Sequence, residues 1–88
     1  MKTIWKYGIP ARVTVLDMPS GAEILTIQMQ GADLCLWALV DPAQSTETRK
    51  FHAYRTGDTA PDSAERYVGT ALASDGSRVW HVFEEDFE

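Results

Sequence analysis

The sequence is short of thiols, of positive charge and of long apolar runs. It has 88 residues and one cysteine, so it cannot form an intramolecular disulfide. Lysine and arginine number 8 against 13 aspartates and glutamates, and the net charge is −5. This balance argues against a general nucleic-acid binder, which needs clustered cations to displace counterions. The longest apolar run, residues 34–40, falls far short of the roughly 20 residues of a membrane-spanning helix. We therefore expect neither general nucleic-acid binding nor membrane association.

We also expect no secretory signal at the start of this sequence. Lys2 and Lys6 interrupt the first residues before any apolar segment can develop. The single thiol, Cys35, lies inside the apolar run, where cysteine behaves as a small hydrophobic residue. A reducing, cytoplasmic location is the expectation that follows.

Length and composition predict one globular domain that covers residues 1–88. Hydrophobic residues make up 44% of the chain, and three Trp, three Tyr and three Phe supply large rings. A chain of this size buries roughly 60% of its unfolded surface, which is enough for one modest core. Because that core is thin, a partner subunit would add stability, and we expect a homo-oligomer, with a two-fold dimer favoured.

The apolar run at residues 34–40 predicts a central strand. Leu34, Leu36, Ala38 and Val40 alternate with Cys35, Trp37 and Leu39, so both faces of such a strand are apolar. A short buried helix is the alternative at this length. Trp37 is expected to fill one core layer, and its replacement by alanine to cost roughly 3–5 kcal/mol.

Turn signals divide the remaining chain into six further strands. The expected strands are residues 3–9, 12–16, 23–30, 49–56, 66–73 and 78–84. In the second, Val13 and Val15 are expected to point inward; in the third, Leu25, Ile27 and Met29 form the dry face. The Asp75-Gly76 pair is the strongest hairpin signal. Two polar loops are expected at residues 41–48 and 57–64, with one helical turn at 62–65.

These elements predict an all-β fold: a small single-domain antiparallel β-sandwich or barrel of about seven short strands. Short connections favour a meander in which strands adjacent in sequence pair with each other. The acidic end, residues 84–88, is expected to be peripheral and solvated.

The sequence offers no motif for catalysis or for a cofactor. His52 and His81 are the only histidines, and nothing has the paired ligand spacing of a zinc site. A nucleophile elbow and a phosphate loop are also absent. We therefore expect no catalytic residues, no metal and no cofactor. An enzyme would require polar residues to converge in space.

The best candidate for a recognition surface is the strand at residues 49–56, which interleaves cations and aromatics. His52 and Tyr54 share one face, where they could clasp a planar ligand. Arg49 and Arg55 share the other face and could close on a phosphate or a carboxylate. The alternative is a partly exposed strand whose cations blunt edge pairing.

The first strand offers a second candidate surface, because Trp5 and Tyr7 share a face beside Lys6. A half-buried edge strand is the alternative there. Lys2, Lys6 and Arg12 also leave room for a local basic patch that binds a small anion.

Several blocks resemble a family of small uncharacterised proteins encoded by bacteriophages and prophages. The blocks are Ile4-Trp5-Lys6-Tyr7, Met18-Pro19-x-Gly21-Ala22-x-Ile24-Leu25, Gln28-Met29-Gln30, Leu36-Trp37-Ala38-Leu39-Val40-Asp41, Thr56-Gly57, Tyr67-x-Gly69-Thr70 and His81-Val82-Phe83-Glu84. They run in order along nearly the whole chain. The resemblance implies a phage or prophage origin and a host bacterial cytoplasm location, and it carries no catalytic residues.

The function expected from these observations is that of a non-enzymatic phage accessory protein. It would bind a host protein or a small anionic ligand, in counter-defence by inhibiting an immune effector or sequestering a nucleotide signal. The alternatives are a structural, virion-associated β protein and a small nucleotide-processing hydrolase.

Overall fold

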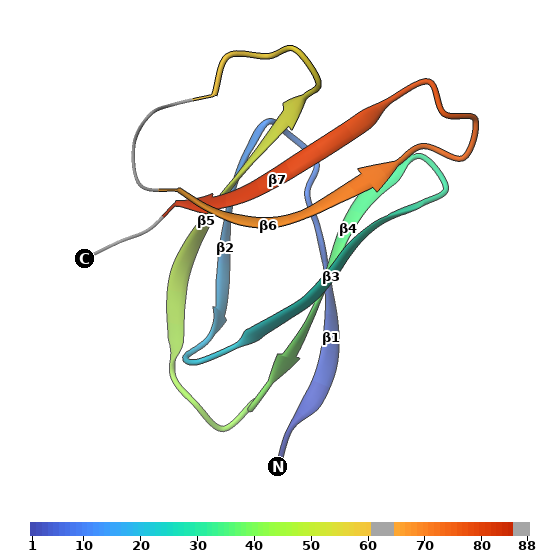
Figure 1. Cartoon of the computed structure of the whole chain (residues 1–88). Helices are drawn as coiled ribbons and strands as arrows, with labels where there is room; N and C mark the ends of the chain where they lie inside the picture. The colour runs from blue at the N-terminus through green and yellow to red at the C-terminus, as the bar shows by residue number, and fades with distance from the viewer. Residues whose placement is uncertain (61–64, 86–88) are drawn as a thin grey trace.

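Strand-forming segments separated by turns dominate the computed structural model, which describes residues 1–60 and 65–85 (Figure 1). The described residues form seven strands and no helix. The strands are β1 (Thr3–Gly8), β2 (Val13–Pro19), β3 (Glu23–Gln30), β4 (Asp33–Val40), β5 (Thr46–Arg55), β6 (Glu65–Leu72) and β7 (Val79–Glu85). The predicted all-β class is confirmed. In the described part of the chain, no helix is long and apolar enough to cross a membrane.

The strands pair in two antiparallel sheets, which makes the fold a sandwich. The three-stranded sheet has the order β1-β4-β3, and the four-stranded sheet has the order β2-β5-β7-β6. The predicted meander is wrong, because β1 pairs with β4 and β2 pairs with β5. The apolar β4 takes a neighbour on each side, β1 and β3, and β2 is left to pair in the other sheet. The prediction of a central strand at residues 34–40 is confirmed.

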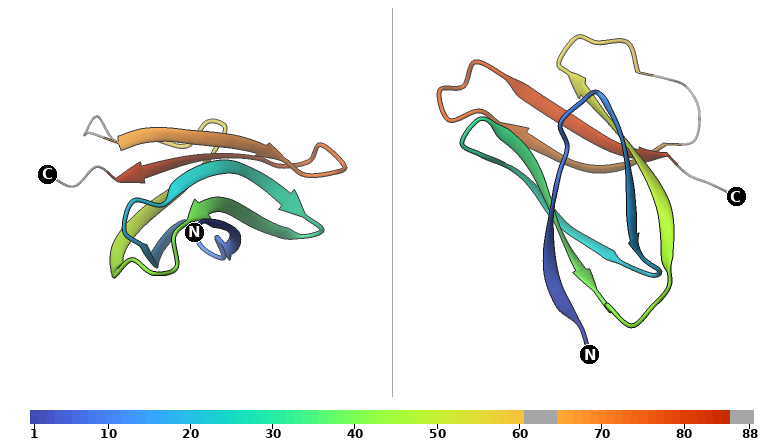
Figure 2. Two further views of the ribbon diagram at one scale, coloured as in Figure 1. Left: turned by 90° about the horizontal axis from the view of Figure 1, so that it is seen from below. Right: turned by 180° about the vertical axis from the view of Figure 1, so that it is seen from behind.

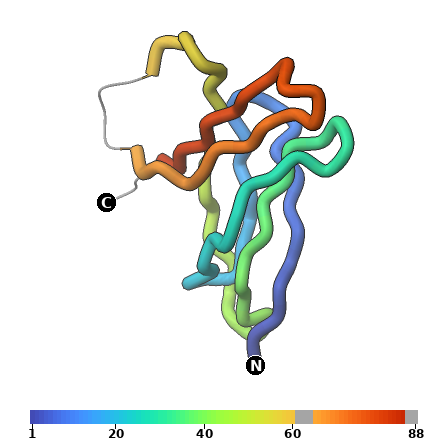
Figure 3. Tube along the Cα trace, turned by 45° about the vertical axis from the view of Figure 1, so that its right-hand side comes forward, coloured from blue at the N-terminus to red at the C-terminus, as the bar shows by residue number. Residues whose placement is uncertain are grey.

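Two pairs of consecutive strands are hairpins, β3–β4 and β6–β7. Gly31 and Gly76 have φ of 61° and 74° in their turns, a conformation that glycine adopts without steric cost. The hairpin predicted from Asp75-Gly76 is therefore confirmed. The turns of the two hairpins lie side by side at one end of the molecule, with the N-terminus at the other (Figure 3).

The core lies between the sheets. Seen from below, β6 and β7 form one layer and β3 and β4 the layer beneath it (Figure 2, left). Gly69 on β6 faces Ile27 on β3 so closely that a Cβ there would lie 3.4 Å from the isoleucine side chain. The largest fully buried side chains are Phe51, Met18, Leu36, Val40 and Val82. The missing side chain of Gly69 thus allows β6 to approach Ile27 of β3 closely.

The inward face of β2 is the opposite of the one predicted. Val13 and Val15 are 49% and 57% exposed, whereas Thr14 and Met18 are buried. The strand continues through Met18, beyond the predicted end at residue 16, and Met18 is large enough to decide which face packs on the core. The alternating valines therefore predict the strand correctly, but they predict the wrong face of it to point inward.

The dry face of β3 also differs from the prediction, because a bulge interrupts the alternation. The register of β3 against β4 shifts between Ile24 and Thr26. Leu25 is the extra residue and is 45% exposed, while Ile24 joins Ile27 and Met29 against the core. A bulge adds one residue to one strand, and the side chains before it therefore change face.

The two faces of β4 are unequal. Leu34, Leu36, Ala38 and Val40 are buried against the other sheet, and Cys35 is also buried. Trp37 and Leu39 point to the outer side and are only half-buried. The expectation that Trp37 fills a closed core layer is therefore wrong.

The acidic end is part of the sheet as far as the structure describes it. Glu84 and Glu85 belong to β7, and Glu84 is 5% exposed, which corrects the expectation of a solvated end from residue 84. Residues 86–88 lie outside the described residues. So do residues 61–64, where most of the predicted helical turn falls; its last residue, Glu65, begins β6.

Candidate functional site

The outer, solvent-facing side of the four-stranded sheet collects both histidines, together with tyrosine, phenylalanine and glutamate side chains. Directly paired residues in antiparallel strands point to the same side, so the register defines this face. It pairs Val13 with His52, His52 with Phe83, and Phe83 with Tyr67. We call it the outer face; its central members are Val13, Val15, Lys50, His52, Tyr54, Glu65, Tyr67, Thr70, Leu72, Val79, His81, Phe83 and Glu85.

Exposed apolar side chains gather on this outer face. Eight large hydrophobic residues of the described chain are exposed, and four of them lie here: Val13, Val15, Tyr67 and Leu72. Phe83 packs edge to face against both Tyr54 and Tyr67, with ring centroids 5.8 and 5.5 Å apart. The result is a continuous aromatic centre between two valines on β2 and a leucine on β6.

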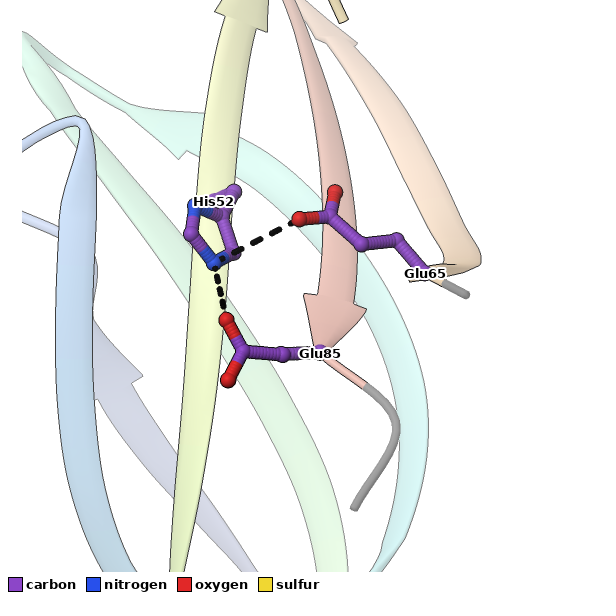
Figure 4. A group of neighbouring side chains, drawn as sticks. All are labelled: His52, Glu65 and Glu85. Carbon is purple, nitrogen blue, oxygen red and sulfur yellow. Dashed lines mark hydrogen bonds and ion pairs between the residues drawn. The ribbon is translucent and has the colours of Figure 1, made fainter. Parts of the chain in front are cut away.

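A histidine and two glutamates converge on the outer face from three neighbouring strands (Figure 4). His52 Nε2 lies 3.0 Å from Glu85 Oε1 and 3.5 Å from Glu65 Oε2. One ligand atom from each residue lies within 4.8 Å of the other two. We call His52, Glu65 and Glu85 the His-Glu-Glu cluster. Lys50 Nζ is 3.7 Å from Glu85 Oε1 and is the nearest cation.

Tyr54 supports this cluster in two ways. Its hydroxyl donates a hydrogen bond of 3.0 Å to Glu65 Oε1. Its ring stacks on the imidazole of His52, with centroids 6.1 Å apart and planes 8° from parallel. Burial, then the hydrogen bond and negative charge of Glu65, then the charge of Glu85 raise the pKa of Tyr54 to about 12. The phenol therefore stays protonated at neutral pH and remains a donor to Glu65.

The second histidine of this face is bonded to hydroxyls at both ring nitrogens. His81 Nε2 lies 2.8 Å from Thr56 Oγ1, and Nδ1 lies 3.1 Å from Thr70 Oγ1. Thr70 Oγ1 also lies 2.6 Å from the hydroxyl of Tyr67. We call Thr56, His81, Thr70 and Tyr67 the hydroxyl–histidine chain. It fixes the imidazole beside the exposed ring of Tyr67.

Arg49 is not on the outer face. Its guanidinium lies between the sheets, where Nε and Nη2 donate to Glu84 at 2.6 and 2.8 Å and Nη1 donates to the carbonyl of Ala22. Burial alone would raise the pKa of Glu84, but hydrogen bonds and charge from Arg49, and then from Arg66, hold it below its ordinary value of 4.5. Arg49 is thus held in a largely buried ion pair with Glu84, and its predicted part in binding a ligand stays a prediction.

The other predicted site residues are dispersed. His52 and Tyr54 share a face as predicted, but their rings stack on each other and leave no slot between them for a planar ligand. Trp5 and Tyr7 lie on β1 in the other sheet. The hydroxyl of Tyr7 is buried with no hydrogen-bond partner among the described residues. Arg55 is exposed at the end of β5, 3.7 Å from Asp58. The six predicted residues therefore form no common cleft within one chain.

A groove between the two hairpin ends brings three cations together beside Asp33 and Asp75. Lys6, Arg12 and Arg78 line it, together with the ring of Trp80. Lys6 donates to Gln30 and Arg12 lies 3.8 Å from Asp58, so two of the three cations already have polar partners. The basic patch expected from Lys2, Lys6 and Arg12 thus has two of its members at this groove.

Sequence reasoning missed Glu65 and Glu85, because no spacing along the chain connects them to His52. The signal lies in the register: Glu65 pairs directly with Glu85, and His52 pairs with Phe83, two residues before Glu85. A correct β5-β7-β6 order would have placed all three side chains on one face. The predicted meander concealed that order.

Fold and surface together define a small all-β sandwich with a polar and aromatic outer face on its larger sheet. The chain belongs to the family described as a domain of unknown function (DUF7352), whose model matches residues 1–88. Searches of curated proteins and of solved structures find no significant match. The family carries no assigned activity, in agreement with the uncharacterised family expected from the sequence.

Proposed function

We propose that this protein is a non-enzymatic binding protein whose outer face docks on a partner protein. The carrying observation is that, among the residues the structure describes, half of the exposed large hydrophobic side chains lie on this one face, around an aromatic centre. Contiguous apolar surface with a polar rim is typical of protein-protein interaction sites. Tyr and Phe are enriched in such interfaces. Small-molecule sites are concave, and an open sheet face therefore suits a protein better than a nucleotide.

Charge on this face favours a partner with basic groups. Asp17, Glu65 and Glu85 carry negative charge there, and among the described strand residues of this face Lys50 is the only lysine or arginine. The chain as a whole carries −5. Apposing two copies of the face would bring like charges together, which is destabilising, whereas Lys or Arg at the rim of another protein would be attracted.

The finer proposal comes from the sequence resemblance, which suggests a phage or prophage protein that acts in the host bacterial cytoplasm. Counter-defence is the corresponding role, and the partner would be a host immune effector. The blocks that carry the resemblance include Thr56, Tyr67, Thr70 and His81, the four members of the hydroxyl–histidine chain. Their position on the outer face supports a functional role for that face.

Photo-crosslinking tests the docking proposal. A photoreactive phenylalanine at position 67 should capture a host protein in bacterial cells, and the same group at Leu25, an exposed leucine of the other sheet, should not. The captured protein is then purified and titrated calorimetrically with variants. Val15→Asp should weaken binding at least tenfold, because it places a charge in an apolar contact, and the matched Leu25→Asp should change it by less than about twofold.

Two results would contradict the docking proposal. One is that Val15→Asp and Leu25→Asp weaken partner binding equally, which would show that the outer face contributes no more to binding than the other sheet. The other is a position-67 adduct of two copies of this chain and nothing else. That adduct would assign the outer face to self-association.

We further propose a homodimer, because the core is thin and both sheets have open edges that a second subunit could cover. Light scattering at micromolar concentration should give twice the chain mass of 9.8 kDa. A mass of one chain at that concentration would defeat the dimer. Repeating the measurement on Val15→Asp shows whether the outer face takes part: an unchanged dimer leaves that face free for the partner.

A further inference from the structure

We propose that the His-Glu-Glu cluster is a binding site for a divalent transition-metal ion, with zinc the best-suited ion. His52 would contribute Nε2, and Glu65 and Glu85 one carboxylate oxygen each. This inference does not rest on the docking proposal: the metal site would exist with or without a partner protein.

The spacing of the three ligand atoms fits a shared metal ion. Zinc bonds nitrogen and oxygen at about 2.0–2.2 Å, so two ligands in a tetrahedral site lie about 3.3–3.5 Å apart. The two observed separations from His52 Nε2 are 3.0 Å to Glu85 and 3.5 Å to Glu65. All three atoms lie within 4.8 Å of one another. Small rotations of the glutamate side chains would complete the geometry.

Hydrogen bonding leaves this cluster incomplete. The nitrogen Nε2 carries at most one hydrogen, yet two carboxylates face it. The side chain of Glu65 is 7% exposed. Its Oε1 accepts from Tyr54, but its Oε2 faces His52 and accepts no hydrogen bond within the described residues. A carboxylate oxygen of a largely buried side chain that faces an imidazole nitrogen and has no hydrogen-bond donor among the described residues is an arrangement that a cation would satisfy.

Neighbouring groups hold the ligands in place. Tyr54 donates to Glu65 and stacks on the ring of His52, so it orients two of the three ligands at once. Hydrogen bonds of this kind to ligating groups usually contribute 10–100-fold to metal affinity. Lys50 is the competing cation, since its ammonium group lies 3.7 Å from the same oxygen of Glu85 that faces His52.

The donor set indicates the class of metal. One imidazole and two carboxylates suit Zn²⁺ and other first-row transition ions, whereas Mg²⁺ prefers oxygen ligands alone. Glu85 is 32% exposed, so a path from solvent exists. Three protein ligands would leave a fourth position for water or for a donor from a bound partner.

Calorimetric titration of the untagged protein with zinc chloride tests the site. We expect saturable binding of one zinc per chain, and negligible binding of magnesium chloride. His52→Ala and Glu85→Gln should each weaken zinc binding at least 100-fold, and Tyr54→Phe by about 10-fold or more. Lys50→Gln should retain or increase the affinity. His81→Ala is the matched control, because it removes the other histidine of the same face, and it should bind zinc like the parent.

Titration with cobalt chloride provides a second readout, which measures light absorption and not the heat of binding. A site of four or five ligands should give visible absorption bands, which His52→Ala should abolish. Circular dichroism checks that each variant is folded. If His52→Ala does not fold, Glu85→Gln, which changes the most exposed ligand, replaces it in the cobalt and zinc measurements. Equal zinc affinity in His52→Ala and His81→Ala would overturn the proposal, as would magnesium binding as tightly as zinc or the lack of a saturable zinc isotherm.

Discussion

Replacing Glu84 with glutamine should destabilise the protein by about 3–5 kcal/mol, because it leaves the guanidinium of Arg49 buried without its counter-charge. Both nitrogens that bond Glu84 lie between the sheets, and the side chains of Arg49 and Glu84 are only 13% and 6% exposed. Urea unfolding followed by fluorescence measures the effect. The control is Glu23→Gln, at an exposed position of β3, which should change stability by less than about 0.5 kcal/mol.

A second variant guards against a protein too unstable to measure. Replacing both Arg49 and Glu84 by methionine removes the two charges together. This double variant should recover much of the stability that Glu84→Gln loses, since well-packed apolar residues often replace a buried ion pair at little cost. Loss of less than about 1 kcal/mol in Glu84→Gln would contradict a structural ion pair.

The same ion pair predicts a dependence of stability on pH. The pKa of Glu84 is held below its ordinary value of 4.5 in the folded protein. Its contribution is therefore complete above about pH 4.5 and is lost as the pH falls through the folded value. Asp41, Asp58 and Asp75 also have lowered pKa values, through hydrogen bonds from nearby groups. Asp75 is exposed and the other two are half-buried at the surface, where solvent screens their interactions, so they contribute little. In Glu84→Gln, the free energy of unfolding should therefore change much less as the pH falls below about 4.5.

Replacing Phe51 with alanine should also cost about 3–5 kcal/mol, because its ring is fully buried and the cavity would lie at the centre of the sandwich. Trp37→Ala should cost only about 2 kcal/mol, since its ring is only partly buried on the outer side of the sheet and about 25 cal/mol is lost per Å² of apolar surface. Urea unfolding of the two variants side by side gives the comparison. A larger loss for Trp37→Ala than for Phe51→Ala would contradict the assignment of Trp37 to an outer surface.

The strands could be predicted from the sequence because β-branched and apolar residues alternate between clear turn signals. Their pairing could not. Nothing local distinguishes β1 beside β4 from β1 beside β2; the choice depends on the long-range packing of Leu36, Ala38 and Val40 against the other sheet. The bulge at Leu25 reversed one face for the same reason, since a bulge follows from pairing and not from propensity.

The candidate site was partly predictable. The sequence indicated His52 and Tyr54 as neighbours on one face, and the structure confirms that they lie together. Arg49 was assigned to a ligand because an arginine in a polar strand is usually exposed. Its burial could be recognised only once Glu84 was known to lie opposite it. The sequence pattern places Glu65 in a helical turn and Glu85 in a solvated acidic end, so neither prediction brings them to His52.

Radical footprinting of the protein with and without its captured partner tests the central claim, that the outer face of the four-stranded sheet is the binding face. Oxidation of Tyr67 and Phe83 should fall several-fold in the complex, while Trp37 on the opposite sheet should react as in the free protein. Protection of Trp37 with no change at Tyr67 and Phe83 would contradict the claim and move the interface to the other side of the sandwich.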